Sequence, residues 1–182
     1  MRDSVLAVSG TLDREMGGTL LKTGNRGYVT NDQSNNQARY DSLRRSIYLP
    51  VVRNAMYELF SAFDYNDPSA PISRRYSTVV PHQALFFLNS PMILEAALVI
   101  TREVVLEIEE EQERVQEVHR RILCREASEL EVERALQFVN NVQAHSEQNQ
   151  VESSDQVEDS VVSAWQAYVQ ALISSSEFLY LD

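Results

Sequence analysis

Cysteine and lysine are nearly absent from this chain of 182 residues, and each absence narrows the possible functions. The single cysteine, Cys124, excludes an internal disulfide framework, a site with several thiolate ligands and a Cys-x-x-Cys-His haem attachment. Lys22 is the only lysine among 16 basic residues. The preference for arginine reflects either fixed, planar ion pairing or a general arginine bias of the source lineage.

Long apolar runs are also missing. A membrane span needs about 18 or more consecutive apolar residues, and nothing in the chain approaches that length. The first ten residues, MRDSVLAVSG, lack the apolar core of a secretory signal. We therefore expect no membrane insertion and no signal peptide in this chain.

Glycine and proline are confined to the first half. All five glycines lie within residues 1–27, and all five prolines lie between residues 50 and 91. The stretch from Met92 to Asp182 contains neither residue and is rich in good helix formers, so it is predicted to be helical. The lack of glycine after residue 27 also excludes most phosphate loops and nucleophile elbows downstream.

Positive charge is scarce in the second half. Residues 1–100 have a net charge of +1 and residues 101–182 a net charge of −12, which together give the total of −11. Because an acidic surface repels phosphate backbones, no nucleic-acid partner is expected. The same surface could instead steer a basic protein partner.

The first half mixes weak helix signals with turns. Residues 3–13 are predicted to form a short helix, and residues 17–42 form a long polar connection. Residues 45–52 have strand-like content, but Pro50 restricts them to an edge strand or an extended segment. A further helix is expected from a cap at Asn54 to about Phe63.

Two helix starts follow in the middle of the chain. Thr78 is a plausible cap for a helix through Leu88, and Ser90 followed by Pro91 favours a second helix. The acidic residues 109–111 are either a solvated face or a break before the next helix.

The last two helices have clear signals. Ser128 and Glu131 have the spacing of a capping box, and a polar linker at 146–158 precedes the final helix. In that helix Trp165 and Tyr168 share one stripe, so Trp165 is expected to be buried against the two preceding helices. The fold class is predicted to be mainly α, with an irregular N-terminal part packed on a C-terminal antiparallel helical bundle. The tail after this helix is expected to be extended and to return towards the N-terminal part.

Histidines offer little catalytic or metal-binding chemistry. His82, His119 and His145 have no metal-ligand spacing, and His119 lies on a different helix face from Cys124. No metal, cofactor or catalytic residue is therefore assigned within this chain.

One constellation resembles a site. His82 follows the paired arginines Arg74 and Arg75, which suggests an acid/base beside an anion clamp. The competing interpretation makes the arginines ion-pair partners of Asp64 or Asp67, and it is the better supported because structural networks also collect charges.

Five ordered sequence blocks carry a resemblance to a known family. They are RRSIYLPVVRN (44–54), FDYNDP (63–68), RRYSTVVPHQALFFLNSP (74–91), HRRILCREASELEVERALQFV (119–139) and SSSEFLY (174–180). The chain resembles the C-terminal domain of unknown function, the PSD-type domain, of planctomycete multidomain surface proteins. In those proteins the domain usually follows a cytochrome-c-like module and a second uncharacterised domain.

The resemblance places the family motif on specific residues. These residues are candidates for a structural role or, more weakly, for a site: Arg44, Arg45, Arg74, Arg75, Thr78, Pro81, His82, Gln83 and Asn89. The amides of Gln83 and Asn89 are predicted to bond backbone groups at the ends of their helix. Residues 124–127 stand where the family more often has Gly-Arg-x-Pro, so we expect a continuous or differently capped helix there.

The resemblance also implies a context. Residues 1–182 are expected to form a single PSD-type domain that lacks its N-terminal portion, with residues 1–91 irregular and residues 92–182 forming the bundle. The parent protein would be exported to the periplasm or cell surface, with haem c in an upstream domain. The leading hypothesis is a non-catalytic scaffold or interaction module for the other domains of the parent protein. The alternatives are a surface enzyme acting on polysaccharide and a docking surface for a cytochrome.

Overall fold

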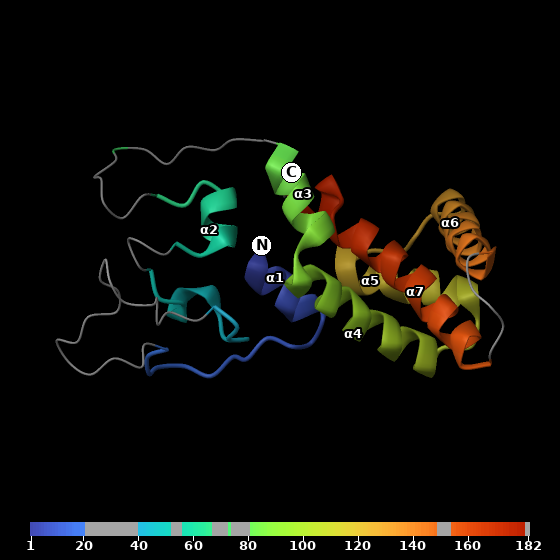
Figure 1. The fold of residues 1–182 in the computed structure, drawn as a ribbon, viewed down its shortest axis with the longest axis horizontal. Coiled ribbons are helices and arrows are strands. Elements are labelled where there is room, and N and C mark those ends of the chain that lie inside the picture. The colour runs from blue at the N-terminus through green and yellow to red at the C-terminus, as the bar shows by residue number, and fades with distance from the viewer. Residues whose placement is uncertain (21–39, 52–55, 67–72, 74–80, 149–153, 181–182) are drawn as a thin grey trace. The chain divides into compact units, whose positions relative to one another are not determined.

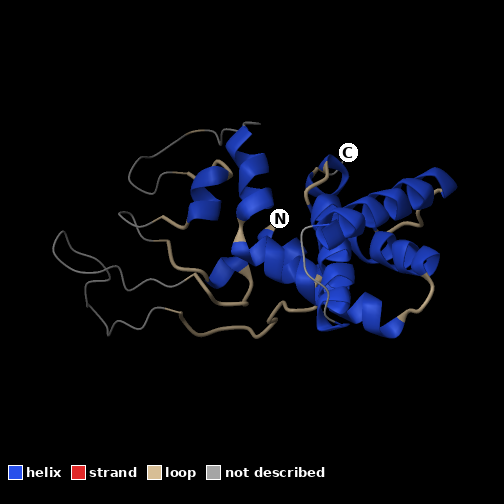
Figure 2. Cartoon of the chain, turned by 45° about the vertical axis from the view of Figure 1, so that its right-hand side comes forward, coloured by secondary structure: helices blue, strands red, loops and turns tan. Residues whose placement is uncertain are grey.

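Helices dominate the structure. The computed structural model describes residues 1–20, 40–51, 56–66, 73, 81–148 and 154–180. Within these ranges the chain forms helices and loops without a β-strand, which confirms the mainly α prediction (Figure 2). The elements are α1 (Arg2–Val8), the 3₁₀ turn η1 (Ser46–Tyr48), α2 (Glu58–Ala62), α3 (Pro81–Asn89), α4 (Pro91–Glu107), α5 (Glu111–Leu123), α6 (Glu129–Gln148), α7 (Ser154–Ile173) and α8 (Ser176–Leu179).

The chain forms two compact units, which are described separately. The helical unit contains Met1, Asp3–Gly10 and Phe87–Asp182, and the loop-rich unit contains Arg2 and Thr11–Phe86. No single described helix is long and apolar enough to cross a membrane, although α3 and α4, bent by 51° at their junction, meet that criterion as a pair.

Of the two alternatives predicted for residues 45–52, an edge strand or an extended segment, the edge strand is wrong for residues 45–51, which the structure describes. Residues 46–48 form η1, and the backbone amides of Tyr48 and Leu49 donate to the carbonyls of Arg45 and Ser46. These local bonds use the donors that a strand ladder would need, and Pro50 has no donor to offer. Among the described residues, β-pairing is limited to one isolated bridge between Asp13 and Arg44.

The first helix is shorter than predicted. It ends at Val8 rather than near residue 13, because Gly10 adopts a positive φ of 73° that a helix cannot continue. The next helix, α2, ends beside Phe63 as expected but begins only at Glu58. The predicted caps at Asn54 and Thr78 lie outside the described residues.

At the break between α3 and α4, a side chain of α7 supplies the missing hydrogen-bond donors. Pro91 begins α4 as predicted, and because it lacks an N–H it cannot bond the carbonyl of Phe87 one turn earlier. The side-chain amide of Gln170 donates to that carbonyl at 3.2 Å and to the Leu88 carbonyl at 2.9 Å. Ser90 lies at the cap position without a side-chain cap bond.

Arg114 closes the junction between α4 and α5. Of the two alternatives for the acidic residues 109–111, the structure shows a helix break, since α4 ends at Glu107 and α5 begins at Glu111, and all three side chains are exposed as well. The Arg114 guanidinium donates to the carbonyls of Ile108 (2.7 Å) and Val105 (3.4 Å) and lies over the Trp165 ring. It satisfies carbonyls at the end of α4 that have no partner within the helix.

The turn between α5 and α6 is tight. Cys124 ends α5 in the left-handed conformation, with φ 56° and ψ 27°, so a distinct turn replaces the continuous helix that was one expectation. The capping box is confirmed: the backbone N–H of Ser128 donates to Glu131 at 2.8 Å, and that of Glu131 donates to the Ser128 hydroxyl at 3.4 Å.

The bundle core forms around α7. In Figure 1 α7 runs beside α4, and it packs against both α4 and α6. It is antiparallel to α4: Gln166 donates to the carbonyl of Leu94, and Gln170, one turn later on α7, donates to the earlier carbonyls of Phe87 and Leu88. The buried apolar residues of α4 to α7 are Ile93, Ala96, Ala97, Ile100, Val104, Val115, Val118, Ile122, Ala135, Val139, Ala164, Trp165, Tyr168, Val169 and Ile173.

Trp165 is buried as predicted, with 1% of its surface exposed. On α6 the buried side chains are Ala135 and Val139, whereas Val132 and Leu136 are half-buried. The C-terminal tail is the helix α8 rather than an extended segment, since the Ser175 hydroxyl accepts a bond from the Phe178 N–H and caps it.

Candidate functional site

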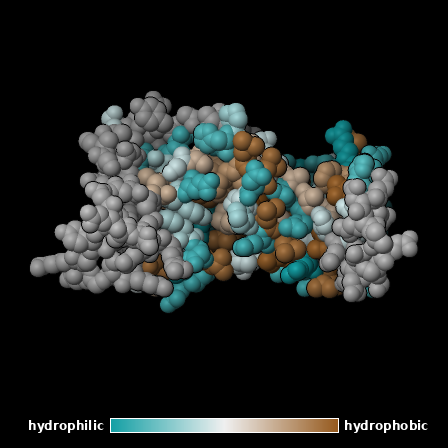
Figure 3. Space-filling view, viewed as in Figure 1, coloured by the Kyte–Doolittle hydropathy of each residue, from teal (hydrophilic) through white to brown (hydrophobic). Residues whose placement is uncertain are grey.

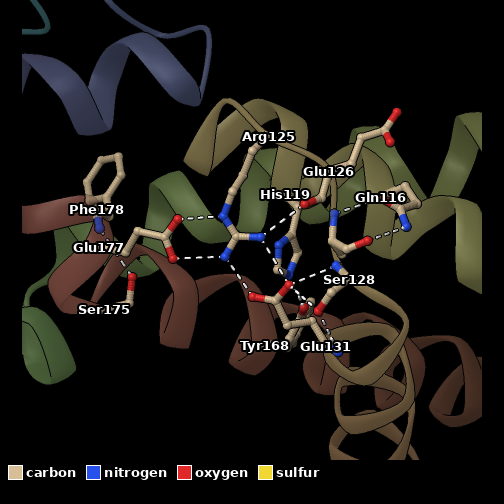
Figure 4. Close-up of polar contacts among 11 residues, drawn as sticks. Gln116, His119, Arg125, Glu126, Ser128, Glu131, Tyr168, Ser175, Glu177 and Phe178 are labelled. Carbon is tan, nitrogen blue, oxygen red and sulfur yellow. Dashed lines mark hydrogen bonds and ion pairs between the residues drawn. The ribbon is translucent and has the colours of Figure 1, made fainter.

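A buried histidine and tyrosine from different helices meet in the helical unit. His119 of α5 and Tyr168 of α7 are 2% and 8% exposed, and His119 Nε2 lies 2.8 Å from Tyr168 Oη. Tyr168 is also held by Trp165, whose ring packs edge-on against it at 6.1 Å between centroids. The close-up in Figure 4 shows the pair at the centre of a polar cluster.

The pair holds one hydrogen more than its mutual bond uses. A neutral imidazole has one N–H and a tyrosine has one O–H, and only one of these hydrogens lies between the two atoms. If Nε2 donates to the hydroxyl, the Tyr168 hydrogen is unused. If the hydroxyl donates, the hydrogen sits on His119 Nδ1, which is buried without a partner among the described residues. In both cases one donor lacks a partner among the described residues.

Burial keeps both side chains uncharged. Desolvation lowers the pKa of His119, with the nearby Arg125 acting in the same direction and Glu131 opposing it. Desolvation also raises the pKa of Tyr168. The pair is therefore a neutral hydrogen-bonding group rather than an imidazolium–phenolate pair.

Arg125 binds two glutamates beside this pair. Its Nη2 and Nε atoms lie 2.6 Å from the carboxylates of Glu131 and Glu177, and Figure 4 shows it between them. The Arg125 guanidinium is the main cause of the lowered pKa values of both carboxyl groups. Glu131 also accepts the two Ser128 donors of the capping box, so the cluster joins the turn before α6 to α8.

A pocket opens next to the buried pair. Its volume is about 300 Å³, and it lies between α5, α6 and α7. His119 and Tyr168 line it together with mostly apolar side chains, among them Phe138 and Leu172. Arg134 of α6 is exposed and also lines the pocket. Among the described residues, no carboxylate forms an ion pair with it.

Exposed glutamates are concentrated at the junction between α4 and α5 of the same unit. Five glutamates between the end of α4 and the first turn of α5 are exposed: Glu107, Glu109, Glu110, Glu111 and Glu113. Within the described residues none of their side chains makes an ion pair or hydrogen bond. Arg114, the nearest cation in sequence, donates to backbone carbonyls instead.

The residues marked by sequence do not form one site in the described part of the chain. Arg44 donates to the carbonyls of Glu15 (2.8 Å) and Gly17 (2.6 Å) and stacks on Tyr48, which closes a loop. Arg45 is exposed at the start of η1. The Arg44 side chain thus stabilises the backbone of the loop-rich unit, whereas Arg45 contributes its backbone carbonyl, which accepts from the Tyr48 N–H.

The helix at 81–89 positions the remaining described candidates. Pro81 and His82 are exposed in its first turn, and Asn89 is exposed at its end. Gln83 is buried and donates to the Ala62 carbonyl at 3.0 Å. Its amide bonds a backbone carbonyl as predicted, and this carbonyl lies at the end of α2.

Three candidates, Arg74, Arg75 and Thr78, lie outside the described residues, as does Asp67. The anion clamp and its competing ion-pair interpretation therefore stay predictions. Within the described ranges, no group of three His, Cys, Asp or Glu side chains comes together to hold a metal ion.

Sequence reasoning missed the His119–Tyr168 pair. The two residues are 49 positions apart, and no local motif links them. The helical spacing of His119 with Val115 and Ile122, both buried, is the one available signal, because it places the histidine near an apolar face.

The described residues thus form a mainly α-helical protein with a buried polar pair and an adjacent pocket in its helical unit. Its family follows from comparison: a family model, PSD1, described as a protein of unknown function (DUF1553), matches residues 1–139. Because the match covers most of the chain, the protein belongs to this family. Comparisons with curated proteins and with solved structures found no similar protein.

Proposed function

We propose that this chain is a non-catalytic interaction module whose acidic helical unit binds a basic protein partner. The observation that carries the proposal is the set of five exposed, unpaired glutamates at the α4–α5 junction, here called the acidic junction. Unpaired surface carboxylates create a negative potential that attracts a positively charged partner and accelerates its association.

The other charges of the helical unit support this assignment. Arg120, Arg121 and Arg125 each bind a glutamate, with N–O distances of 2.8, 2.6 and 2.6 Å. These cations therefore neutralise carboxylates elsewhere and leave the acidic junction uncompensated. Its position on a helix end fixed by Arg114 presents the carboxylates on a rigid scaffold.

The resemblance to cytochrome-linked surface proteins suggests the partner. We propose a basic c-type cytochrome or a basic neighbouring domain of an exported parent protein. The polysaccharide-enzyme alternative has no comparable support: His82 is exposed, and the carboxylates with lowered pKa values, Glu131 and Glu177, are held as anions by Arg125.

Binding to a basic cytochrome c, measured by surface plasmon resonance, tests the proposal. The variant Glu109→Gln/Glu110→Gln/Glu111→Gln should weaken binding about tenfold at low ionic strength, because three unit charges leave one contact surface. The matched control removes three exposed carboxylates elsewhere on the unit: Glu95→Gln/Glu126→Gln/Glu129→Gln. The control should lose only a few-fold in affinity. Equal losses in the two variants, or no binding by the wild type, would reject the proposal.

A further inference from the structure

The pocket beside His119 and Tyr168 has the features of a small-molecule site. Its volume of about 300 Å³ reaches the lower end of the range of roughly 300–1,000 Å³ that small-molecule sites occupy. Such sites combine apolar walls with a few polar groups that fix the ligand's orientation. This pocket has that combination, and all its lining residues belong to the helical unit.

The apolar walls come from one face of each of three helices. Leu123 follows His119 by one turn on α5, Phe138 follows Arg134 by one turn on α6, and Leu172 follows Tyr168 on α7. Side chains four residues apart lie on the same helix face, so each helix contributes a polar residue with an apolar neighbour. Phe138 remains 40% exposed, which leaves part of its ring free to contact a flat apolar ligand.

The polar groups of the pocket select a hydrogen-bond acceptor. The His119–Tyr168 pair keeps one unused donor, and leaving a buried polar group without a partner is unfavourable. Arg134 adds an unpaired guanidinium at the rim. The rim carboxylates Glu131 and Glu177 are already bound to Arg125 and are less able to repel an anion.

We infer that this pocket binds a small aromatic monocarboxylate, with the aromatic body against Phe138 and Leu172 and the carboxylate between Arg134 and the His119–Tyr168 pair. This site is independent of the acidic junction and does not rest on the proposed partner. None of the residues marked by the family motif lines this pocket.

Isothermal titration calorimetry of the whole chain with 2-naphthoate tests the inference. We expect saturable binding at one site with a micromolar dissociation constant, and at least tenfold weaker binding of the neutral 2-naphthamide. The variant Ala171→Trp places a large side chain on an exposed position of the pocket wall and should abolish binding. Because Ala171 is exposed, this variant should keep the wild-type circular dichroism spectrum and melting midpoint.

A pair of arginine variants tests the carboxylate contact. Arg134→Gln should weaken 2-naphthoate binding about tenfold and leave 2-naphthamide binding unchanged, whereas Arg102→Gln removes an equal charge from an exposed position on α4 and should change neither. The inference is overturned if 2-naphthoate gives no saturable heat up to millimolar concentration or if Ala171→Trp binds like the wild type. It is also overturned if Arg134→Gln and Arg102→Gln behave alike, since the site would then not select an anion.

Discussion

Single residues in the helical unit combine burial with an incomplete set of hydrogen bonds. Trp165 Nε1, Thr101 Oγ1 and His119 Nδ1 are buried without a partner among the described residues. The Trp165 ring packs edge-on against Tyr168 and lies beneath the guanidinium of Arg114. The stability of the unit therefore depends strongly on a few large side chains.

Trp165→Ala should destabilise the protein severely. Removing a fully buried tryptophan costs about 3–5 kcal/mol, a large share of the total stability of a domain. We expect an unfolded protein or a sharply lowered urea midpoint, measured by circular dichroism. Intrinsic fluorescence of the wild type gives a second check, because a buried Trp165 emits at short wavelength and resists iodide quenching. Emission like that of free tryptophan would contradict the burial.

His119 should make stability fall in mild acid. Burial lowers the pKa of His119, so below about pH 6.5, the pKa of an unperturbed histidine, the unfolded chain binds a proton that the folded chain does not. Stability is therefore fully present above that pH and declines as the pH falls towards the lowered pKa. Urea midpoints at about pH 7.5 and about pH 5.5 measure the decline.

His119→Leu should flatten this pH dependence between those values, because the titrating group is gone. The exposed His82 supplies the matched control, and His82→Gln should keep the wild-type decline. A His119→Leu variant with the full wild-type slope would show that other groups cause it.

At the scale of elements, side chains fix the helix ends, and some of these helix ends could be predicted from the sequence. The Ser128–Glu131 capping box and the Ser90–Pro91 boundary could be predicted because their signals are local. The edge-strand alternative for residues 45–52 failed because strand-like composition does not determine the partners of the backbone N–H groups, and those of Tyr48 and Leu49 bond locally. The extended tail failed similarly, since Ser175 caps α8.

Cys124→Gly should stabilise the turn between α5 and α6. Cys124 holds a left-handed conformation, which costs a non-glycine residue about 1–2 kcal/mol and costs glycine much less. We expect a gain of about 1 kcal/mol, reduced from that range because glycine also gains entropy in the unfolded chain. Cys124→Ala removes the thiol but keeps the Cβ, so it should not raise the urea midpoint. Equal midpoints for the two variants would show that the turn is not strained.

At the scale of the whole molecule, sequence indicates the fold class more readily than the site. The absence of glycine and proline after residue 91 and the amphipathic stripes predict the helices, because both signals repeat along the chain. The His119–Tyr168 pair depends on the relative register of α5 and α7, which no local pattern specifies. The neighbouring helices likewise decide which side chains of α6 are buried, here Ala135 and Val139.

The charge distribution of the molecule leads to its proposed role. The −12 net charge of residues 101–182 could be counted from the sequence, but its consequence depended on which carboxylates are paired. Glu103, Glu117, Glu131 and Glu177 bind arginines, whereas the acidic junction binds none among the described residues. Electrostatic attraction of this kind acts mainly on the association step.

The rate of association with a basic cytochrome c tests the central claim most directly. Stopped-flow measurements from about 20 to about 300 mM salt should show the association rate constant of the wild type falling at least tenfold, with little change in dissociation. The Glu109→Gln/Glu110→Gln/Glu111→Gln variant should associate more slowly at low salt and lose most of this dependence. An association rate that is insensitive to salt, or equally sensitive in this variant, would contradict a binding role for the acidic junction.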